Sequence, residues 1–519
     1  MLIRTSLFIA VGTAALIAVG GRAILSAGAP KPPLVITHGI ASGDVTPTSA
    51  VIWARASSKA QMHVEIDTEP TFGHAKSHGS AKADEATDFT SHLVVDGLQP
   101  STRYWYRVWL SGAGGTGRSE VADNQIGTFT TAPSSWDSRP LSFILAADVG
   151  GQRYCRNAAT GGYAIFGAMQ KLAPDFVIVN GDAIYGDGDC PAAGPEPGWV
   201  NIPGDFPSIA DSAVDWTNVD AVRDIYLRHW RYNRADPYTQ DLLRSTSTIS
   251  QWDDHEVIND FGAPWTYWNS ANINRAGYPN IVAAGLDTFF AYAAIARQPV
   301  DRDRIYRSLR WGNDLEVFVL DARSYRDRND TLDTLAEPKP MLGPDQIAWL
   351  VNGIQQSTAT WKVVSSDVPI SIPTGSLTFG RDAWARLPGE PATGFRRELL
   401  EQLLPGLDRI NATNVVFVAT DVHYATNLAY AIDADADGDI LTLHEVVRGP
   451  LNAVKNPPKT VAQLDPSANP TVLYAEGNFF NFGFVRIRRE EDGKMHFVAD
   501  VRDEHGVQRP GSVINLTPQ

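Results

Sequence analysis

The apolar and polar positions divide the chain into two parts with different periods. Between residues 34 and 133, short strand-like runs such as SAVIWARA and RYWYRVWL recur at even intervals, separated by Gly, Pro, Ser and Asp. This spacing predicts a small all-β sandwich. From Leu141 onward, apolar runs such as LSFILAAD and DFVIVNGD flank a segment with helical spacing. That alternation predicts an α/β domain over residues 139–519, reached through a linker rich in Pro and Ser.

Carboxylates follow almost every predicted strand of the α/β domain. Because the carboxyl ends of parallel strands meet at one edge of a sheet, these side chains are expected to converge. A carboxylate can bridge two metal ions, and a phenolate oxygen is a strong ligand for a trivalent one. An Asp after a strand is also a common helix cap, but its repetition favours a metal site. In chain order the strand ends carry Asp148, Asp182 with Tyr185, Asp253-Asp254-His255, Asp321 with Arg323, and Asp421 with His423.

Residues 1–33 are not expected to belong to the fold. A short positive start precedes an apolar stretch from Leu7 to Gly20 that is rich in small residues. This is typical of an export signal, with cleavage expected after Ala27, and an uncleaved single-helix anchor is the alternative. We therefore predict an exported protein that is periplasmic, secreted or held at the cell surface.

The overall charge limits the partners of the protein. With 519 residues and a formal net charge of −15, the chain has no basic field to neutralise a phosphate backbone. This argues against nucleic acid as a specific partner. We expect a monomer.

The chain has two cysteines, Cys155 and Cys190, and both lie close to the predicted strand ends. An exported protein can keep a disulfide, so the two residues are expected to pair. The alternative is that Cys155 binds metal as a thiolate. Both interpretations stay open at this point.

A family resemblance covers most of the chain. The order NGDAIY, WDDHEV, LDARSYR, LGPDQIAWL and ATDVHY resembles the alkaline phosphatase D family of calcineurin-like metallophosphoesterases. The segment Leu98–Val108 resembles the tyrosine corner of a fibronectin type III module. The resemblance implies a four-layer α/β metallophosphoesterase sandwich, preceded by a small all-β sandwich over residues 34–133.

The same resemblance implies roles for individual residues. Asp182 would bridge two metals, Tyr185 would ligate a trivalent ion, and Asp254 would hold the second metal. The family usually carries iron(III) with calcium, and manganese or zinc are the alternatives. Asp148 stands where the family commonly has a Cys, and it matches the first motif of purple acid phosphatases instead. We therefore expect Asp148 as a ligand, with Cys155 as the fallback; the implied set is completed by Asp421 and His423 as ligands and by His255 as the catalytic residue.

Other residues are expected to support this site. A guanidinium matches a phosphate bidentately, so Arg153, Arg156 and Arg323 are candidates for binding it. Glu256 is expected to orient the imidazole of His255. Asn180 and Asp253 are expected to lie behind the ligands.

Two cations would lower the pKa of a bound water and offset the charge that develops on a phosphoryl group. We therefore predict a metal-dependent phosphoric ester hydrolase, a phosphodiesterase and/or an alkaline phosphomonoesterase. One alternative is a phospholipase-type diesterase that contacts a membrane or cell wall, with Trp265, Tyr267 and Trp268 stacking on an apolar leaving group. The other alternative is a non-catalytic surface-binding protein with a vestigial metal site.

Overall fold

The computed structural model describes residues 33–519 apart from residues 113, 115–116, 120, 263–274 and 337. The predicted export segment therefore lies outside the described residues except for Pro33, as do Trp265, Tyr267 and Trp268. Within the described part, no helix has both the length and the apolar character that a membrane span requires.

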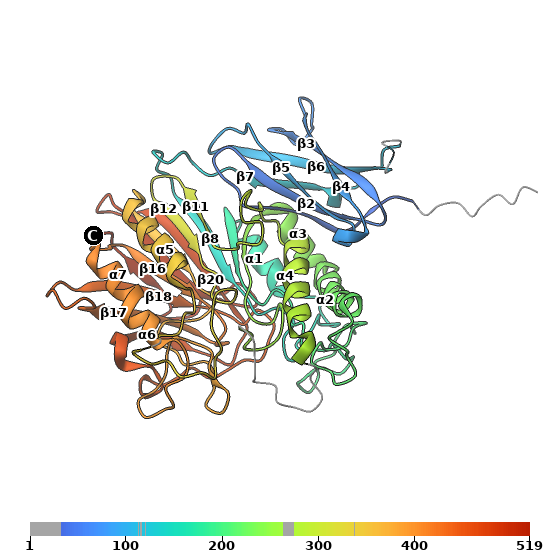
Figure 1. Cartoon of the computed structure of the whole chain (residues 1–519). Helices are drawn as coiled ribbons and strands as arrows, with labels where there is room; N and C mark the ends of the chain where they lie inside the picture. Colours follow the sequence, from blue (N-terminus) through green and yellow to red (C-terminus); the bar gives the residue numbers. More distant parts are fainter. Residues whose placement is uncertain (1–32, 113, 115–116, 120, 263–274, 337) are drawn as a thin grey trace, which may run out of the picture. The chain divides into compact units, whose positions relative to one another are not determined.

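Two large sheets carry the fold (Figure 1). In the nine-stranded sheet, β8 (Leu141–Ala146), β9 (Phe176–Asn180) and β10 (Ser247–Gln251) are parallel neighbours. In the seven-stranded sheet, β12, β13, β16 and β18 are parallel neighbours. Their bounds are Leu315–Val319, Trp361–Ser365, Val415–Ala419 and Leu441–Val447.

The remaining strands of the two sheets pair mainly antiparallel. The nine-stranded sheet also contains β1 (Ile36–Gly43), β2 (Ala50–Ala56), β5 (Thr90–Val95), β20 (Asn481–Arg489), β21 (Met495–Asp503) and β22 (Ile514–Leu516). The seven-stranded sheet also contains β11 (Arg307–Trp311), β17 (Ala425–Ile432) and β19 (Pro470–Glu476). A short hairpin is formed by β14 (Gly375–Ser376) and β15 (Gly380–Arg381).

The central strands are buried on both faces because alternate side chains enter different cores. Phe143 and Leu145 of β8 pack between the sheets with Val363 of β13, whereas Ile144 packs outward against the helix residue Ile165. Figure 1 shows helices on the outer faces of both sheets. This helix, sheet, sheet, helix order confirms the four predicted layers. The helices are α1 (Ala164–Lys171), α2 (Val219–Arg234), α3 (Pro237–Ser245), α4 (Tyr278–Tyr292), α5 (Pro344–Gln356), α6 (Arg396–Glu398) and α7 (Leu404–Arg409).

The amino-terminal part is β-rich, as predicted. A four-stranded sheet in the order β4 (Lys76–Ala83), β3 (Ala60–Asp67), β6 (Arg103–Gly112), β7 (Ile126–Thr130) packs on β1, β2 and β5. The hydroxyl of Tyr104 accepts a hydrogen bond from the Gln99 N–H at 2.8 Å, which forms a tyrosine corner. Strand β1 pairs in parallel with β10 at Gly43 and Thr248, so one sheet of the sandwich continues into the α/β sheet.

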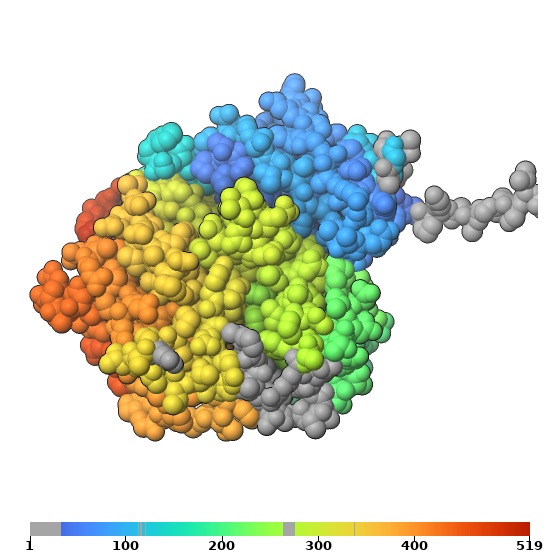
Figure 2. Space-filling view, viewed as in Figure 1, coloured from blue at the N-terminus to red at the C-terminus, as the bar shows by residue number. Residues whose placement is uncertain are grey.

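Buried ion pairs join the same two regions. The carboxylate of Asp88, after β4, accepts hydrogen bonds from Arg55 of β2, from Arg231 of α2 and from the Tyr292 hydroxyl of α4. In the space-filling view the sandwich (blue) lies directly against the green and yellow-green segments of the α/β domain (Figure 2). Residues 34–519 accordingly form one compact unit.

Candidate metal centre

The carboxyl ends of the parallel strands of both sheets deliver the predicted ligands to one place. Asp148, Asp182 and Asp421 each lie two residues beyond β8, β9 and β16, and His423 follows Asp421. All four have a positive φ, of 63°, 49°, 70° and 60° respectively. A non-glycine residue in this region costs ~1–3 kcal/mol, and such strain concentrates at functional sites. The strand ends therefore turn sharply to aim these side chains.

Four overlapping groups of side chains among the described residues are close enough to hold metal ions. Within each group, one ligand atom from every residue lies within 4.8 Å of the others. The shared residues, Asp182 and Asp254, connect the groups into a single centre. The groups are Asp148–Asp182–His423, Asp182–Asp254–His255, Asp253–Asp254–Asp421 and Asp254–Asp260–Asp382.

Cations fit this centre because several of its buried carboxylate oxygens lack hydrogen-bond partners among the described residues. Both carboxylate oxygens of Asp148, and one each of Asp182, Asp254 and Asp421, are buried without a hydrogen-bond partner among the described residues. Burial and neighbouring carboxylates raise the pKa of Asp148, Asp182 and Asp421 well above the usual value. An uncompensated buried charge is costly, and a bound cation removes that cost.

His423 has the tautomer that a metal ligand needs. Its Nδ1 donates to the backbone carbonyl of Val454 at 2.8 Å, which leaves Nε2 unprotonated, so that Nε2 accepts a hydrogen bond from the Tyr185 hydroxyl. That Nε2 lies 3.0 Å from the Tyr185 hydroxyl and 3.8 Å from Asp148 Oδ1. Burial lowers the pKa of His423 to about 4, so the imidazole is neutral. A carbonyl that holds the far nitrogen is the usual support of a ligating histidine.

His255 is oriented by Asp187. Asp187 Oδ1 lies 2.6 Å from His255 Nδ1, and Asp187 Oδ2 accepts the Asn259 N–H at 3.0 Å. Burial would lower the pKa of His255, but the carboxylates of Asp187, Asp254 and Asp182 raise it well above the usual value. The prediction that Glu256 orients this imidazole is wrong. Asp187 was overlooked although it ends the same run that contains Asp182.

Glu256 supports the ligand loops through their backbone. Its carboxylate accepts the N–H groups of Asp182 at 3.2 Å, Ala183 at 2.7 Å and Asp253 at 2.8 Å. Asn180, also expected behind the ligands, donates from Nδ2 to the Ser365 hydroxyl at 2.7 Å and so ties β9 to β13 of the other sheet. These contacts fix the turn that presents Asp182.

Two glycines permit the close approach of the ligand loops. A Cβ at Gly449 would lie 2.0 Å from the Asp148 carboxylate, and one at Gly181 would lie 2.3 Å from the Asp253 Cβ. Both glycines have a positive φ. Gly449 follows β18. The sequence did not indicate its role, because its contact with Asp148 depends on which strand ends lie side by side in the fold.

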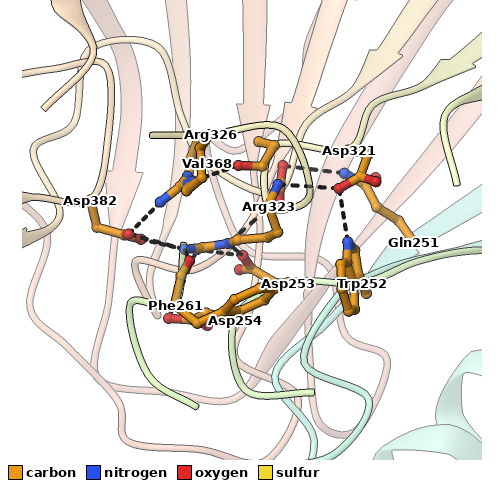
Figure 3. Close-up of polar contacts among 12 residues, drawn as sticks. Gln251, Trp252, Asp253, Asp254, Phe261, Asp321, Arg323, Arg326, Val368 and Asp382 are labelled. Atoms are coloured by element: carbon orange, nitrogen blue, oxygen red, sulfur yellow. Dashed lines mark hydrogen bonds and ion pairs between the residues drawn. The ribbon is translucent and has the colours of Figure 1, made fainter. Parts of the chain in front are cut away.

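Arg323 is not placed to bind a phosphate. It is fully buried; its Nε donates to Asp253 at 2.6 Å and its Nη1 to Asp382 at 3.0 Å (Figure 3). Arg326 also pairs with Asp382. The expectation for Arg323 is therefore corrected, since carboxylates occupy its guanidinium and no surface is left for a substrate. Burial alone would raise the pKa of Asp254, but Arg323 and His255 lower it.

The other predicted arginines differ in exposure. Arg156 Nε lies 3.5 Å from Asp236, and its guanidinium packs on the ring of Tyr232. Arg153 is exposed and pairs with the exposed Asp189. Arg153 remains the accessible member of the predicted set.

Cys155 and Cys190 form a disulfide. The fallback role of Cys155 as a thiolate metal ligand is therefore wrong, because its sulfur is bonded to Cys190. The disulfide joins the loop after β8 to the loop after β9. On the first of these loops, a Cβ at Gly151 would lie 2.4 Å from the Tyr185 ring. The ring of Tyr185, on the second loop, thus packs against Gly151 of the first.

Comparisons with known proteins match most of the chain. The PhoD-like phosphatase pattern matches residues 145–495, and the pattern of the amino-terminal domain of PhoD-like phosphatases matches residues 23–133. Alkaline phosphatase D of Bacillus subtilis (strain 168) is 25% identical over 429 residues, which cover 76% of this chain and 65% of that relative.

Solved structures show the same fold. A structure of PhoD superposes with a TM-score of 0.70 and 19% identity, over 93% of this chain and 89% of that chain. A purple acid phosphatase from yellow lupin (Lupinus luteus) seeds superposes with a TM-score of 0.56 and 11% identity, over 93% and 74%. The metallophosphoesterase fold predicted from the sequence is thereby confirmed. With the family pattern matched over most of its length, the chain belongs to the PhoD-like phosphatase family.

Proposed function

We propose that this protein hydrolyses phosphoric esters, as a phosphodiesterase and/or an alkaline phosphomonoesterase, at a centre that holds two metal cations. The observation that carries the proposal is the shared carboxylate Asp182, which links two candidate ligand groups. Each carboxylate in these groups keeps at least one buried oxygen without a hydrogen-bond partner among the described residues. The Bacillus relative, named alkaline phosphatase D, supports the same activity.

The ligands divide into two sets by chemistry. Asp148, Asp182, Tyr185 and His423 would hold the first cation; the Tyr185 phenol favours iron(III) there. Asp182, Asp254 and Asp421 would hold the second, and an all-carboxylate set suits calcium. When bound, the two cations lower the pKa of a coordinated water and offset charge on the phosphoryl oxygens.

The protein's own groups position the substrate and handle the proton. His255 Nδ1 is held by Asp187, so Nε2 is the nitrogen that is free to contact a phosphoryl oxygen or to donate a proton to the leaving oxygen. The raised pKa of His255 favours the protonated form that such a donor needs. Arg153, at the surface beside the disulfide, is the remaining candidate for binding the substrate phosphate.

Export and domain roles are also proposals. A disulfide persists in oxidising compartments, so Cys155–Cys190 supports export of the chain. We assign residues 34–133 a structural role and residues 139–519 the catalytic one.

Elemental analysis and hydrolysis of nitrophenyl phosphate and bis(nitrophenyl) phosphate, before and after chelation, test the function. We expect two metal equivalents, iron and calcium, and hydrolysis that chelation abolishes and metal restores. The ratio of the two rates decides between monoester and diester preference. Metal-free protein, or hydrolysis that survives complete metal removal, would contradict the proposal.

A further inference from the structure

A small cavity lies behind the metal centre, between strands β8 to β10 and the helices that cover them. Its volume is about 70 Å³, and most of its wall is apolar. Val149 and Ala183, which directly follow the ligands Asp148 and Asp182, form part of the wall. The cavity therefore adjoins the backs of two ligand turns. Apolar wall residues include Ala146, Val179, Leu243, Phe289 and Leu451.

Arg234 is the one charged residue among those that line this cavity. It is 9% exposed, and no carboxylate of the described residues forms an ion pair with it. Its guanidinium donates to the backbone carbonyl of Tyr292 and lies 4.7 Å from the ring of Trp53. Burial lowers the pKa of Arg234 to about 10, so the side chain is still charged at neutral pH.

Most other buried arginines of the described residues are paired with a carboxylate. Arg448 is not, but its guanidinium donates to two backbone carbonyls and to Asn427 Oδ1. Arg307 pairs with Asp44 at 2.7 Å, and Arg323 pairs with Asp253. A buried cation without a counter-charge is costly, and a carbonyl and an aromatic ring offset only part of that cost. Arg234 donates to a single carbonyl among the described residues, so a negative charge from outside the chain would stabilise it.

Trp230 is a second residue of the cavity wall that carries a hydrogen-bond donor. It lies one helical turn before Arg234 on α2, so both side chains are on one face of the helix. Trp230 is 3% exposed and lines the cavity. Its indole Nε1 is buried and has no acceptor among the described residues. A buried N–H without an acceptor carries a desolvation penalty of ~1–3 kcal/mol.

We propose that this cavity binds one compact monovalent anion, such as chloride, which pairs with the Arg234 guanidinium and accepts the Trp230 N–H. A single charge is favoured because the mostly apolar wall offers too few donors to offset the desolvation of a dianion such as inorganic phosphate. The anion would stabilise the fold behind the turns of Asp148 and Asp182. This site is separate from the phosphoryl site and does not depend on the proposed function.

Anomalous diffraction from crystals soaked in sodium bromide tests the site. We expect one bromide peak inside the cavity beside Arg234 in the unmodified protein, and its loss in Arg234→Met. An empty or water-filled cavity in bromide-soaked crystals would overturn the proposal, as would a peak that persists in Arg234→Met.

Thermal unfolding gives a second measurement, in case Arg234→Met does not fold. Chloride should raise the melting temperature by about a few degrees over sodium gluconate at equal ionic strength, because gluconate is too large for the cavity. Trp230→Phe, which removes only the N–H donor, should reduce this chloride effect. The matched control is Trp361→Phe: Trp361 Nε1 donates to the Met495 carbonyl, remote from the cavity, and the chloride effect should be unchanged. Equal chloride effects in the two variants would count against the site.

Discussion

Two buried groups of carboxylates lie side by side at the strand ends, and they differ in how their charge is balanced. Asp253 and Asp382 are paired with Arg323, which is fully buried with them. Within the described part of the chain, Asp148, Asp182 and Asp421 have no cationic side chain in hydrogen-bonding contact. Each keeps a buried oxygen without a hydrogen-bond partner, as Asp253 and Asp382 also do. Asp254 belongs to both groups. Its Oδ2 lies 3.8 Å from Arg323 Nη2, and it is also a member of the candidate metal-binding groups.

The difference separates a structural network from a binding site. Carboxylates paired with an arginine have part of their charge offset within the chain, so they gain less from a cation. Carboxylates left without compensation raise the energy of the folded chain until an ion binds. The unbalanced group, rather than the number of acidic residues, therefore marks the metal centre.

Asp182→Asn should give the largest effect, because the substitution removes a shared charge from the uncompensated group. We expect phosphoester hydrolysis to fall by about three orders of magnitude or more, equivalent to ~4 kcal/mol, with loss of at least one metal equivalent. Steady-state kinetics and elemental analysis measure the two effects. Asp303→Asn, an exposed carboxylate paired with Arg297, is the control and should behave as the unmodified protein. Full metal content with normal turnover in Asp182→Asn would contradict the comparison.

Arg323→Met should break the compensated group. It leaves Asp253 and Asp382 buried without their cation, so we expect the free energy of unfolding to fall by ~3–5 kcal/mol. Asp148→Asn, measured in the metal-free protein, should raise stability instead because it removes an uncompensated charge. Chemical denaturation after chelation compares the two variants. Loss of stability in both would mean that the two groups do not differ.

The metal-free protein should also respond to pH in a definite direction. Burial raises the pKa of Asp148, Asp182 and Asp421, so the folded chain binds protons more tightly than the unfolded chain. The stability associated with these groups is present at low pH and is lost as the pH rises through their folded-state pKa values. Metal binding should reverse this dependence, because cations and protons compete for the same carboxylates. Unfolding at several pH values with and without metal would show the reversal.

His255→Ala and Asp187→Asn should have intermediate effects. We expect about a 100-fold loss of activity for His255→Ala with both metals retained, because a positioned acid group is removed. Asp187→Asn should cost about tenfold, since it removes the support of the imidazole but not the imidazole itself. Metal analysis beside the kinetics separates the roles. Loss of metal in His255→Ala would make His255 a ligand of the uncompensated group.

Local pattern predicted which strand-end carboxylates lie close together, and long-range contacts determined what it could not predict. Asp148, Asp182 and Asp421 follow apolar runs directly, so a strand end and a carboxylate are visible in the sequence together. The pairing of Arg323 with Asp382, and the fit of Gly449 against Asp148, depend on which loops meet across two sheets. Local sequence could not separate a disulfide from a thiolate ligand at Cys155, because only the distance to Cys190 decides it.

The continuity of the sandwich with the α/β sheet was likewise not predicted. It rests on the pairing of β1 with β10, which join residues about 200 positions apart in the chain. Sequence spacing defines each strand but not its partner. The predicted boundary at residues 133–139 therefore separates two patterns of sequence within one compact unit.

Substitution of Asp88 should give the smallest effect, and it extends the comparison of carboxylates with and without arginine partners beyond the metal centre. It is a compensated carboxylate, held by Arg55 and Arg231, and its contacts join the sandwich to α2. Burial opposes the charged form, but hydrogen bonds from Arg231, Arg55 and Tyr292 lower the pKa of Asp88 to about 2. A depressed folded-state pKa stabilises the fold above the unfolded value, and that stability is lost as the pH falls toward 2. Solvent screening at half-buried Arg231 limits the stabilisation from the ion pairs of Asp88 to about 1 kcal/mol. Asp88→Asn should therefore lower the free energy of unfolding at neutral pH by this amount and flatten its decrease between pH 4 and 2. Turnover should be unchanged, because the pairing of Asp88 with Arg55 and Arg231 stabilises the fold and takes no part in the metal centre.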